Sequence, residues 1–162
     1  LGIDKFDAAQ ALEGFLGTHR RLEVVGTRNN ITVIDDFAHN PDKVKASVSA
    51  LKSYPGRLIM MFQPHGFSPM RMMGRQIIDE FCAQMSDEEI YFAGGTVTRD
   101  ISSRDLISRA VENGKQARYF DNREAAGEFI LANARPGDRI VIMGARDNSL
   151  PGFCQTILER LK

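Results

Sequence analysis

The chain has 162 residues, of which 43% are hydrophobic, and its formal net charge at pH 7 is zero. This length suits one domain with a full hydrophobic core, and the neutral charge gives no support for a nucleic-acid-binding or membrane-binding surface. The apolar runs are only about five residues long, too short to span a membrane, and no signal peptide is present.

The two cysteines, Cys82 and Cys154, stand among apolar residues and lack the spacing of a zinc site. This pattern favours a reduced, cytoplasmic protein. The chain opens at Leu1, in helix-like sequence and without a methionine, so we expect it to be a piece of a longer protein.

In chain order, the sequence first predicts a helix over residues 4–15 and then two strands over 22–27 and 31–34. Asn29-Asn30 joins the strands and is typical of a tight hairpin turn. Later apolar runs predict further strands at 58–62, 90–92, 117–120 and 140–143.

Helical spacing of apolar side chains follows each of the later strands and the strand at 31–34. The predicted helices begin at or soon after Pro41, which can start a helix, Arg71, Ser102 with Asp105, Asp121 with Glu124, and Ser149.

Five strand–helix units in succession predict an α/β fold, a three-layer Rossmann-like domain with helices on both faces of the sheet. The sheet is expected to be mostly parallel, with about six strands, and the 22–27 strand should form an antiparallel edge. Ligands bind at the carboxyl ends of the strands in such sheets. The candidate loops are therefore 35–41, 63–71, 93–101 and 144–149.

The first candidate loop, Asp35-Asp36-Phe37-Ala38-His39-Asn40-Pro41, places two carboxylates and an imidazole before a helix N-terminus. Such a group can bind a ribose, a ligand amine or Mg²⁺, and the helix N-terminus favours an anion. The alternative is structural: Asp36 and Asn40 cap the helix and His39 packs against neighbouring residues.

The other candidate segments also allow two interpretations. His65 could orient a substrate and Arg71 could bind a carboxylate, or both belong to a rigid Pro/Gly loop. Gly144 allows close approach of a ligand, or starts a simple turn capped by Ser149. Arg20-Arg21 could bind phosphate or form a basic surface turn, and the 93–101 segment gives only a weak signal.

Three common catalytic or nucleotide-binding motifs are absent: the Gly-x-x-x-x-Gly-Lys-Ser/Thr phosphate loop, the Gly-x-Gly-x-x-Gly fingerprint and the Gly-x-Ser-x-Gly elbow. If the chain serves a nucleotide-dependent enzyme, another domain must therefore supply the phosphate site.

Three motifs in matching order resemble the carboxy-terminal domain of the Mur ligases, the ATP-dependent amide-forming enzymes of peptidoglycan synthesis. These are Phe15-x-Gly17-x-x-Arg20-Arg21-x-Glu23, the Asp35–Pro41 segment, and Phe62-Gln63-Pro64-His65, which resembles the UDP-N-acetylmuramate–L-alanine ligase branch. The resemblance covers residues 1–162, with 1–21 as the end of a linker from a missing central domain.

The resemblance implies that ATP converts a substrate carboxylate to an acyl phosphate, which an amino acid's amine then attacks. It implies ATP and Mg²⁺ as cofactors, bound mainly by the missing central domain, and UDP-N-acetylmuramate and an amino acid as substrates. No catalytic residue or metal ligand is expected in this domain. The implied ATP-binding residues are Arg20, Arg21, Asp36 and His39, and the implied amino-acid-binding residues are Asn40, His65, Arg71, Gly144 and Arg146.

The sequence departs from the family pattern where Gly66 and Pro69 replace arginines of the alanine-adding branch, and where Arg146 replaces a common glycine. The added amino acid or peptide therefore stays open, as does the oligomeric state. Two other functions also stay open: a non-catalytic ligand-binding module of the same fold, and a metal hydrolase using Asp35, Asp36, His39 and His65.

Overall fold

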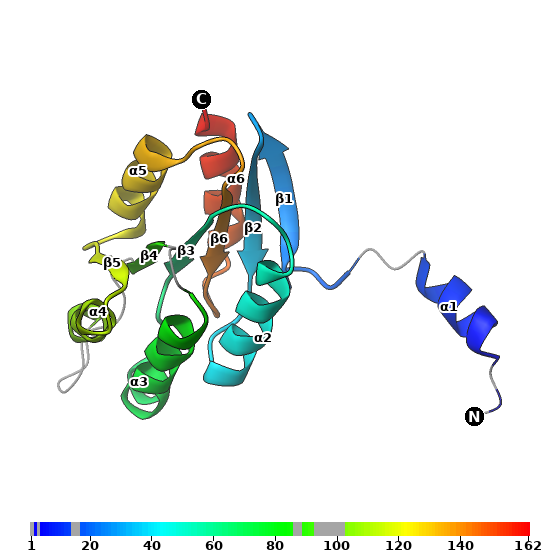
Figure 1. Cartoon of the computed structure of the whole chain (residues 1–162), viewed down its shortest axis with the longest axis horizontal. Helices are drawn as coiled ribbons and strands as arrows, with labels where there is room; N and C mark the ends of the chain where they lie inside the picture. Colours follow the sequence, from blue (N-terminus) through cyan, green and yellow to red (C-terminus); the bar gives the residue numbers. More distant parts are fainter. Residues whose placement is uncertain (1, 3, 14–16, 86–88, 93–102) are drawn as a thin grey trace.

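The computed structural model describes residues 2, 4–13, 17–85, 89–92 and 103–162. In this part of the chain, six strands form one sheet in the order β1-β2-β6-β3-β4-β5 (Figure 1). Their bounds are β1 Glu23–Arg28, β2 Ile31–Asp36, β3 Leu58–Phe62, β4 Glu89–Phe92, β5 Gln116–Tyr119 and β6 Arg139–Met143. β1 pairs antiparallel with β2 and all other neighbours are parallel, which confirms the predicted class and the antiparallel edge strand.

Helices cover both faces of the sheet, as predicted. Their bounds are α1 Lys5–Glu13, α2 Pro41–Lys52, α3 Phe67–Gln84, α4 Ser103–Glu112, α5 Arg123–Asn133 and α6 Leu150–Arg160. Buried side chains of α2, α3 and α4 form one core with one face of the strands, and those of α5 and α6 form a second core on the other face. In Figure 1, α1 lies apart from these layers.

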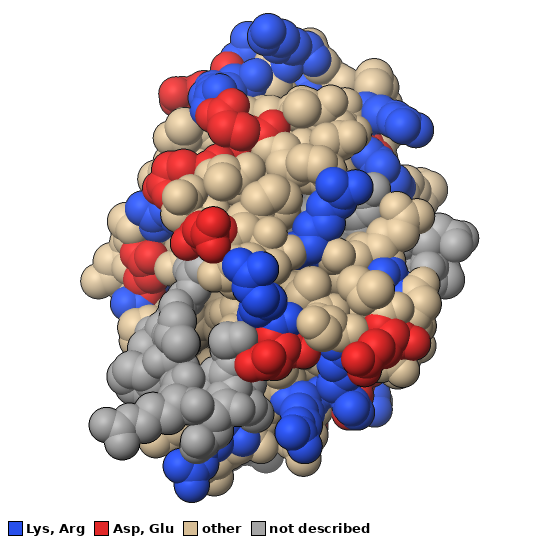
Figure 2. All heavy atoms as spheres, turned by 90° about the vertical axis from the view of Figure 1, so that its left-hand side faces the viewer, with Lys and Arg blue, Asp and Glu red and all other residues tan. Residues whose placement is uncertain are grey.

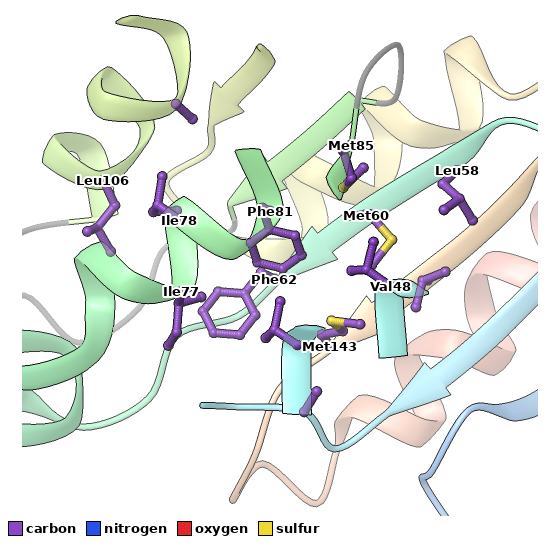
Figure 3. Close-up of a cluster of buried hydrophobic side chains, with 14 of the residues drawn as sticks. Val48, Leu58, Met60, Phe62, Ile77, Ile78, Phe81, Met85, Leu106 and Met143 are labelled. Atoms are coloured by element: carbon purple, nitrogen blue, oxygen red, sulfur yellow. The ribbon is translucent and has the colours of Figure 1, made fainter. Parts of the chain in front are cut away.

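The two central strands, β3 and β6, are buried at every position. This explains their continuous apolar sequence, because both faces of each strand meet a helix layer. Phe62 of β3 and Phe81 of α3 form an edge-to-face pair with ring centroids 5.8 Å apart, in the first core (Figure 3).

Asn29 and Asn30 both adopt left-handed backbone angles, with φ of 51° and 61°, between β1 and β2. A hairpin turn of this kind needs positive φ at both central residues, which asparagine tolerates better than most side chains do. The predicted turn is therefore confirmed.

Three predicted boundaries are wrong. Asp35 and Asp36 are the last residues of β2 and not part of a loop, because they pair with Ile142 and Met143 of β6. α3 already begins at Phe67, so Arg71 lies on a helix; Pro69 is tolerated in its first turn, where no backbone donor is required. The cap of α5 is Asn122 and not Asp121, since the Asn122 side chain accepts a bond from the Ala125 amide.

Candidate functional site

Three of the four candidate segments meet at one edge of the sheet, because β2, β6 and β3 are neighbours and run in the same direction. The Gly144 amide donates to the Asp36 carbonyl at 3.1 Å, and the Gln63 amide donates to the Met143 carbonyl at 2.8 Å. The backbone therefore joins the ends of the three strands. The fourth predicted segment, 93–101, lies outside the described residues.

Asp36 is a buried carboxylate at the end of β2, with 4% of its surface exposed. Its Oδ1 accepts a hydrogen bond from the Ala38 amide at 3.2 Å, while its Oδ2 has no hydrogen-bond partner in the described part of the chain. Burial raises the pKa of Asp36, although the nearby Ser47 hydroxyl and backbone amides oppose that rise. A buried acceptor without a partner is costly, so this oxygen marks Asp36 as a residue whose position needs an explanation.

A hollow of about 220 Å³ adjoins Asp36 and is lined by Arg21, Leu22, Asp36, Ala38, Lys43, Ala46 and Ser47. It thus combines two cationic side chains, Arg21 and Lys43, with the carboxylate of Asp36. Cations suit phosphate oxygens, and a carboxylate suits the hydroxyl donors of a sugar. The hollow can therefore accept a ligand that carries both groups.

Lys43 and Ser47 were not predicted as site residues. They lie four residues apart in α2, so both project from the same helix face toward the hollow. That spacing, directly after the Asp35–Pro41 segment, is a signal that could have identified them from the sequence.

Arg20 is buried, unlike its neighbour Arg21, with 8% of its surface exposed. Its Nε donates to Asp35 Oδ2 at 3.1 Å, its Nη2 to the Gly144 carbonyl at 2.9 Å and its Nη1 to the Asp147 carbonyl at 3.3 Å. Its guanidinium also lies 5.1 Å from the centre of the Phe37 ring. The structure thus places Arg20 inside the protein and only Arg21 at the hollow, which corrects the expectation that both arginines face a ligand.

Asp35 is the partner of Arg20 in this buried ion pair and is 1% exposed. Burial raises the pKa of Asp35, and the Arg20 guanidinium opposes the rise. Its Oδ1 has no hydrogen-bond partner in the residues that are described.

His39 and Asn40 occupy the turn before α2. The His39 Nδ1 lies 2.8 Å from the Phe37 carbonyl oxygen, and the His39 and Phe37 rings are nearly perpendicular, with centroids 5.2 Å apart. Asn40 caps α2, because its Oδ1 accepts the Lys43 amide at 2.9 Å. The structural interpretation is therefore confirmed for Asn40, whereas Asp36 does not cap the helix and instead lines the hollow.

The segment after β6 is organised by Asp147. Its Oδ1 accepts the Ser149 amide at 2.9 Å and the Ser149 hydroxyl at 2.5 Å, and its Oδ2 accepts Gln63 Nε2 at 2.7 Å and Arg123 Nη1 at 3.2 Å. These donors, above all the Ser149 hydroxyl, lower the pKa of Asp147 to about 2. Asp147 thereby holds Gln63, two residues before His65, against the 144–149 segment.

Position 144 has no room for a side chain between its protein neighbours. A Cβ there would lie 2.8 Å from Leu150 Cδ1 and 3.1 Å from the Gln63 carbonyl oxygen. Protein atoms therefore fill the space that was predicted to admit a ligand.

The remaining predicted residues are exposed. His65 lies between β3 and α3, Arg71 on α3, and Arg146 after β6. Arg146 has a φ of 63°, a left-handed angle that favours glycine and costs other residues about 1 kcal/mol. This angle explains why a glycine suits the position.

Charge is mixed on the face that lies to the left in Figure 1. Figure 2 shows Lys and Arg side chains there interspersed with Asp and Glu. Among the described residues, Arg109 of α4 pairs with Asp79 of α3 at 2.8 Å. Both signs of charge are therefore present on the visible described part of this face.

Within the described ranges, no group of three or more His, Cys, Asp or Glu side chains could hold a metal ion. None of the described helices is long and apolar enough to cross a membrane.

Comparison with known proteins identifies the family of the chain. Residues 20–146 match the model of the family "Mur ligase, glutamate ligase domain". UDP-N-acetylmuramate–L-alanine ligases of Lachnospira eligens and Acetivibrio thermocellus are 37% and 38% identical over 150 and 155 residues. Each alignment covers 91% of this chain but only 33% and 32% of the relative, so the chain spans about a third of the length of these relatives.

Solved structures share the fold. A domain of a putative UDP-N-acetylmuramate:L-alanyl-γ-D-glutamyl-diaminopimelate ligase from Haemophilus ducreyi has a TM-score of 0.65 at 26% identity, covering 88% of this chain and all of that domain. The UDP-N-acetylmuramate-alanine ligase of Thermotoga maritima has a TM-score of 0.75 at 21% identity, covering 98% of this chain and 34% of that one. With the family match over most of its length, the chain belongs to the Mur ligase family and represents its carboxy-terminal domain.

Proposed function

We propose that the chain is the closing domain of an ATP-dependent ligase that joins L-alanine to UDP-N-acetylmuramate in cytoplasmic peptidoglycan synthesis. The relatives that match most of this chain at 37–38% identity are named UDP-N-acetylmuramate–L-alanine ligases. The observation that carries the proposal is the hollow that Asp36, a buried carboxylate at the end of β2, lines together with Arg21 and Lys43.

On the ATP side, we assign the ribose hydroxyls to Asp36 and the phosphates to Arg21 and Lys43. A ribose hydroxyl would donate to the Asp36 carboxylate where it lines the hollow, and a hydrogen bond to a charged, buried group is stronger than one between neutral groups. We assign His39, which lies in the turn before α2, to the border of this position. ATP, when bound, supplies the phosphoryl group that activates the substrate carboxylate.

On the amino-acid side, we assign His65 and Arg146 to the incoming amino acid, with Asn40 and Arg71 at the border of its pocket. The Gln63–Asp147 bond of 2.7 Å fixes the segment that carries His65 to the segment that carries Arg146. We assign Gly144 to the support of this wall, since its neighbours are Leu150 and Gln63. Arg146 would provide the cation for the amino-acid carboxylate that Gly66 and Pro69 cannot provide.

The mechanism that follows gives this domain a positioning role. It would close over a central domain that would hold the phosphate loop and Mg²⁺, and it would exclude water from a hydrolysable acyl phosphate. Its own side chains would hold the nucleotide and direct the amine toward the activated carboxyl group, without supplying an acid or base.

The test uses the full-length ligase with Arg21→Ala and Asp36→Asn. Loss of a charged hydrogen bond should raise the KM for ATP by roughly 10- to 100-fold. Arg135→Ala is the matched control, because Arg135 is an exposed arginine just before β6, at the opposite edge of the sheet. An unchanged KM for ATP in both site variants would refute the assignment.

The second candidate for the amine substrate is a peptide in place of L-alanine. A murein peptide ligase from Psychrobacter arcticus shares the fold, with a TM-score of 0.71 at 24% identity, and covers 99% of this chain and 33% of that one. The full-length enzyme should be assayed with L-alanine, glycine, L-serine and an L-alanine-initiated tripeptide. Preference for L-alanine supports the proposal, whereas preference for the tripeptide would reassign the enzyme to a peptide-adding ligase.

A further inference from the structure

Arg20 and Arg21 are adjacent in sequence but have opposite environments. Arg20 is 8% exposed, whereas Arg21 is exposed and borders the hollow beside Asp36. Arg21 also borders a second hollow of about 550 Å³, lined by Gly17, Thr18, His19, Arg21, Leu22, Glu23 and Val24.

The backbone around Arg21 produces this difference. Arg20 and Leu22 both have left-handed backbone angles, with φ of 56° and 46°. Such angles cost a non-glycine residue about 1 kcal/mol or more and persist only where surrounding contacts enforce them. Two of them on either side of Arg21 imply that strong contacts hold this segment.

Arg20 provides most of those contacts. Its backbone amide donates to Glu23 Oε2 at 2.6 Å, and its carbonyl accepts the Phe37 amide at 2.7 Å. Its guanidinium donates to Asp35 and to two carbonyls of the 144–149 segment. Arg20 therefore joins the segment before β1 to the carboxyl ends of β2 and β6. Only the planar fork of arginine can serve three acceptors in this arrangement.

We propose that Arg20 is a positioning residue, whose buried guanidinium fixes the 18–22 segment so that Arg21 is held at the hollow beside Asp36. This rests on the proposed role of Arg21 toward ATP, but it gives Arg20 no contact with the nucleotide. It also makes the 144–149 segment part of the support for the ATP side, because Gly144 and Asp147 supply two of the three acceptors.

The first experiment measures hydrogen exchange in the full-length protein with Arg20→Lys. Lysine keeps the charge beside buried Asp35, so the domain should stay folded, but it cannot make the three bonds. We expect peptides that cover residues 18–23 and the Phe37 amide to exchange at least roughly tenfold faster, while peptides of β6 exchange as in the wild type. Unchanged exchange at 18–23 would overturn the proposal.

A second variant covers the case in which Arg20→Lys fails to fold. Arg20→Met combined with Asp35→Leu replaces the buried ion pair by an apolar pair, a change that proteins often tolerate. This double variant also loses both carbonyl bonds, so the same acceleration at 18–23 is expected, with β6 again as the internal reference.

The second experiment is a cycle of KM values for ATP with Arg20→Lys, Arg21→Ala and both together. If Arg20 acts through Arg21, Arg20→Lys raises the KM by roughly three- to tenfold and adds nothing once Arg21 is removed. If the increases in KM caused by the two single substitutions multiply in the double variant, the proposal is wrong. It is also wrong if Arg20→Lys lowers kcat and leaves KM unchanged, as a merely structural role predicts. An unchanged KM in Arg21→Ala alone would refute the ATP role of Arg21, and hydrogen exchange then decides whether Arg20 fixes the segment.

Discussion

Replacing Asp147 by asparagine should remove a part of the stability that depends on pH. The carboxylate accepts four hydrogen bonds, from the amide and hydroxyl of Ser149, from Gln63 and from Arg123. These donors hold its pKa at about 2, below the ordinary 3.8. Asparagine keeps the shape of the side chain but loses the charge and one acceptor.

The magnitude follows from the shift in pKa. One pKa unit corresponds to about 1.4 kcal/mol, so a shift of nearly two units amounts to roughly 2–3 kcal/mol. A quarter of the side chain, 25%, is exposed to solvent, which screens the interaction and leaves roughly 1–2 kcal/mol.

Stability depends on pH here as it does for any carboxylate whose pKa is lowered by folding. The stabilisation is fully present above the unfolded-state pKa near 3.8 and disappears as the pH falls through about 2. At pH 3 the unfolded state has already taken up most of a proton, so about half of the stabilisation is lost.

The assay is urea unfolding of wild-type and Asp147→Asn chains, followed by far-ultraviolet circular dichroism at pH 7 and pH 3. The difference in free energy of unfolding should be roughly 1–2 kcal/mol at pH 7 and about half of that at pH 3. Comparing the two chains cancels the other titrating groups. Asp121→Asn is the control, because Asp121 is 84% exposed and should change stability by less than about 0.5 kcal/mol at either pH. This account would be refuted if the difference in free energy of unfolding between wild type and Asp147→Asn stays constant or increases from pH 7 to pH 3.

Three further predictions concern packing, backbone strain and thiol reactivity. Gly144→Ala should destabilise the chain by about 1–3 kcal/mol, because its Cβ would meet the fully buried Leu150; Gly152→Ala, where a Cβ meets nothing within 4 Å, should not lower the urea midpoint. Arg146→Gly should be more stable than Arg146→Ala by about 1 kcal/mol, since φ is 63°; the opposite order in thermal unfolding would contradict the left-handed angle. Burial raises the pKa of Cys154 to about 12, so a thiol reagent at pH 8 should leave it unlabelled in the folded chain, and rapid labelling detected by mass spectrometry would show that the α6 core opens.

Local sequence determined most of the secondary structure. The apolar runs at 58–62 and 140–143 could be assigned to strands without a structure. A strand that is buried on both faces carries apolar side chains at consecutive positions, which makes it easy to recognise. The Asn29-Asn30 turn was likewise predictable, since few residue types tolerate its backbone angles. The Asp35–Pro41, Gln63–His65 and Gly144–Asp147 segments were also identified, because a parallel sheet brings the carboxyl ends of its strands to one edge.

The roles of individual polar residues within those segments were not local properties. Asn40 looked like a ligand contact or a cap, and only the bond to the Lys43 amide distinguished the two. Gly144 suggested an open approach for a ligand, whereas the Leu150 side chain and the Gln63 carbonyl occupy that space.

Arg20 and Arg21 show the same division most clearly. The sequence by itself determined that two arginines precede an edge strand, and a phosphate site was the natural interpretation. Only the tertiary structure decided that Arg20 turns inward, because its three acceptors lie 15, 124 and 127 residues away along the chain. Secondary structure follows from the spacing of neighbouring side chains, but the partner of a buried charge depends on which strands the fold places side by side.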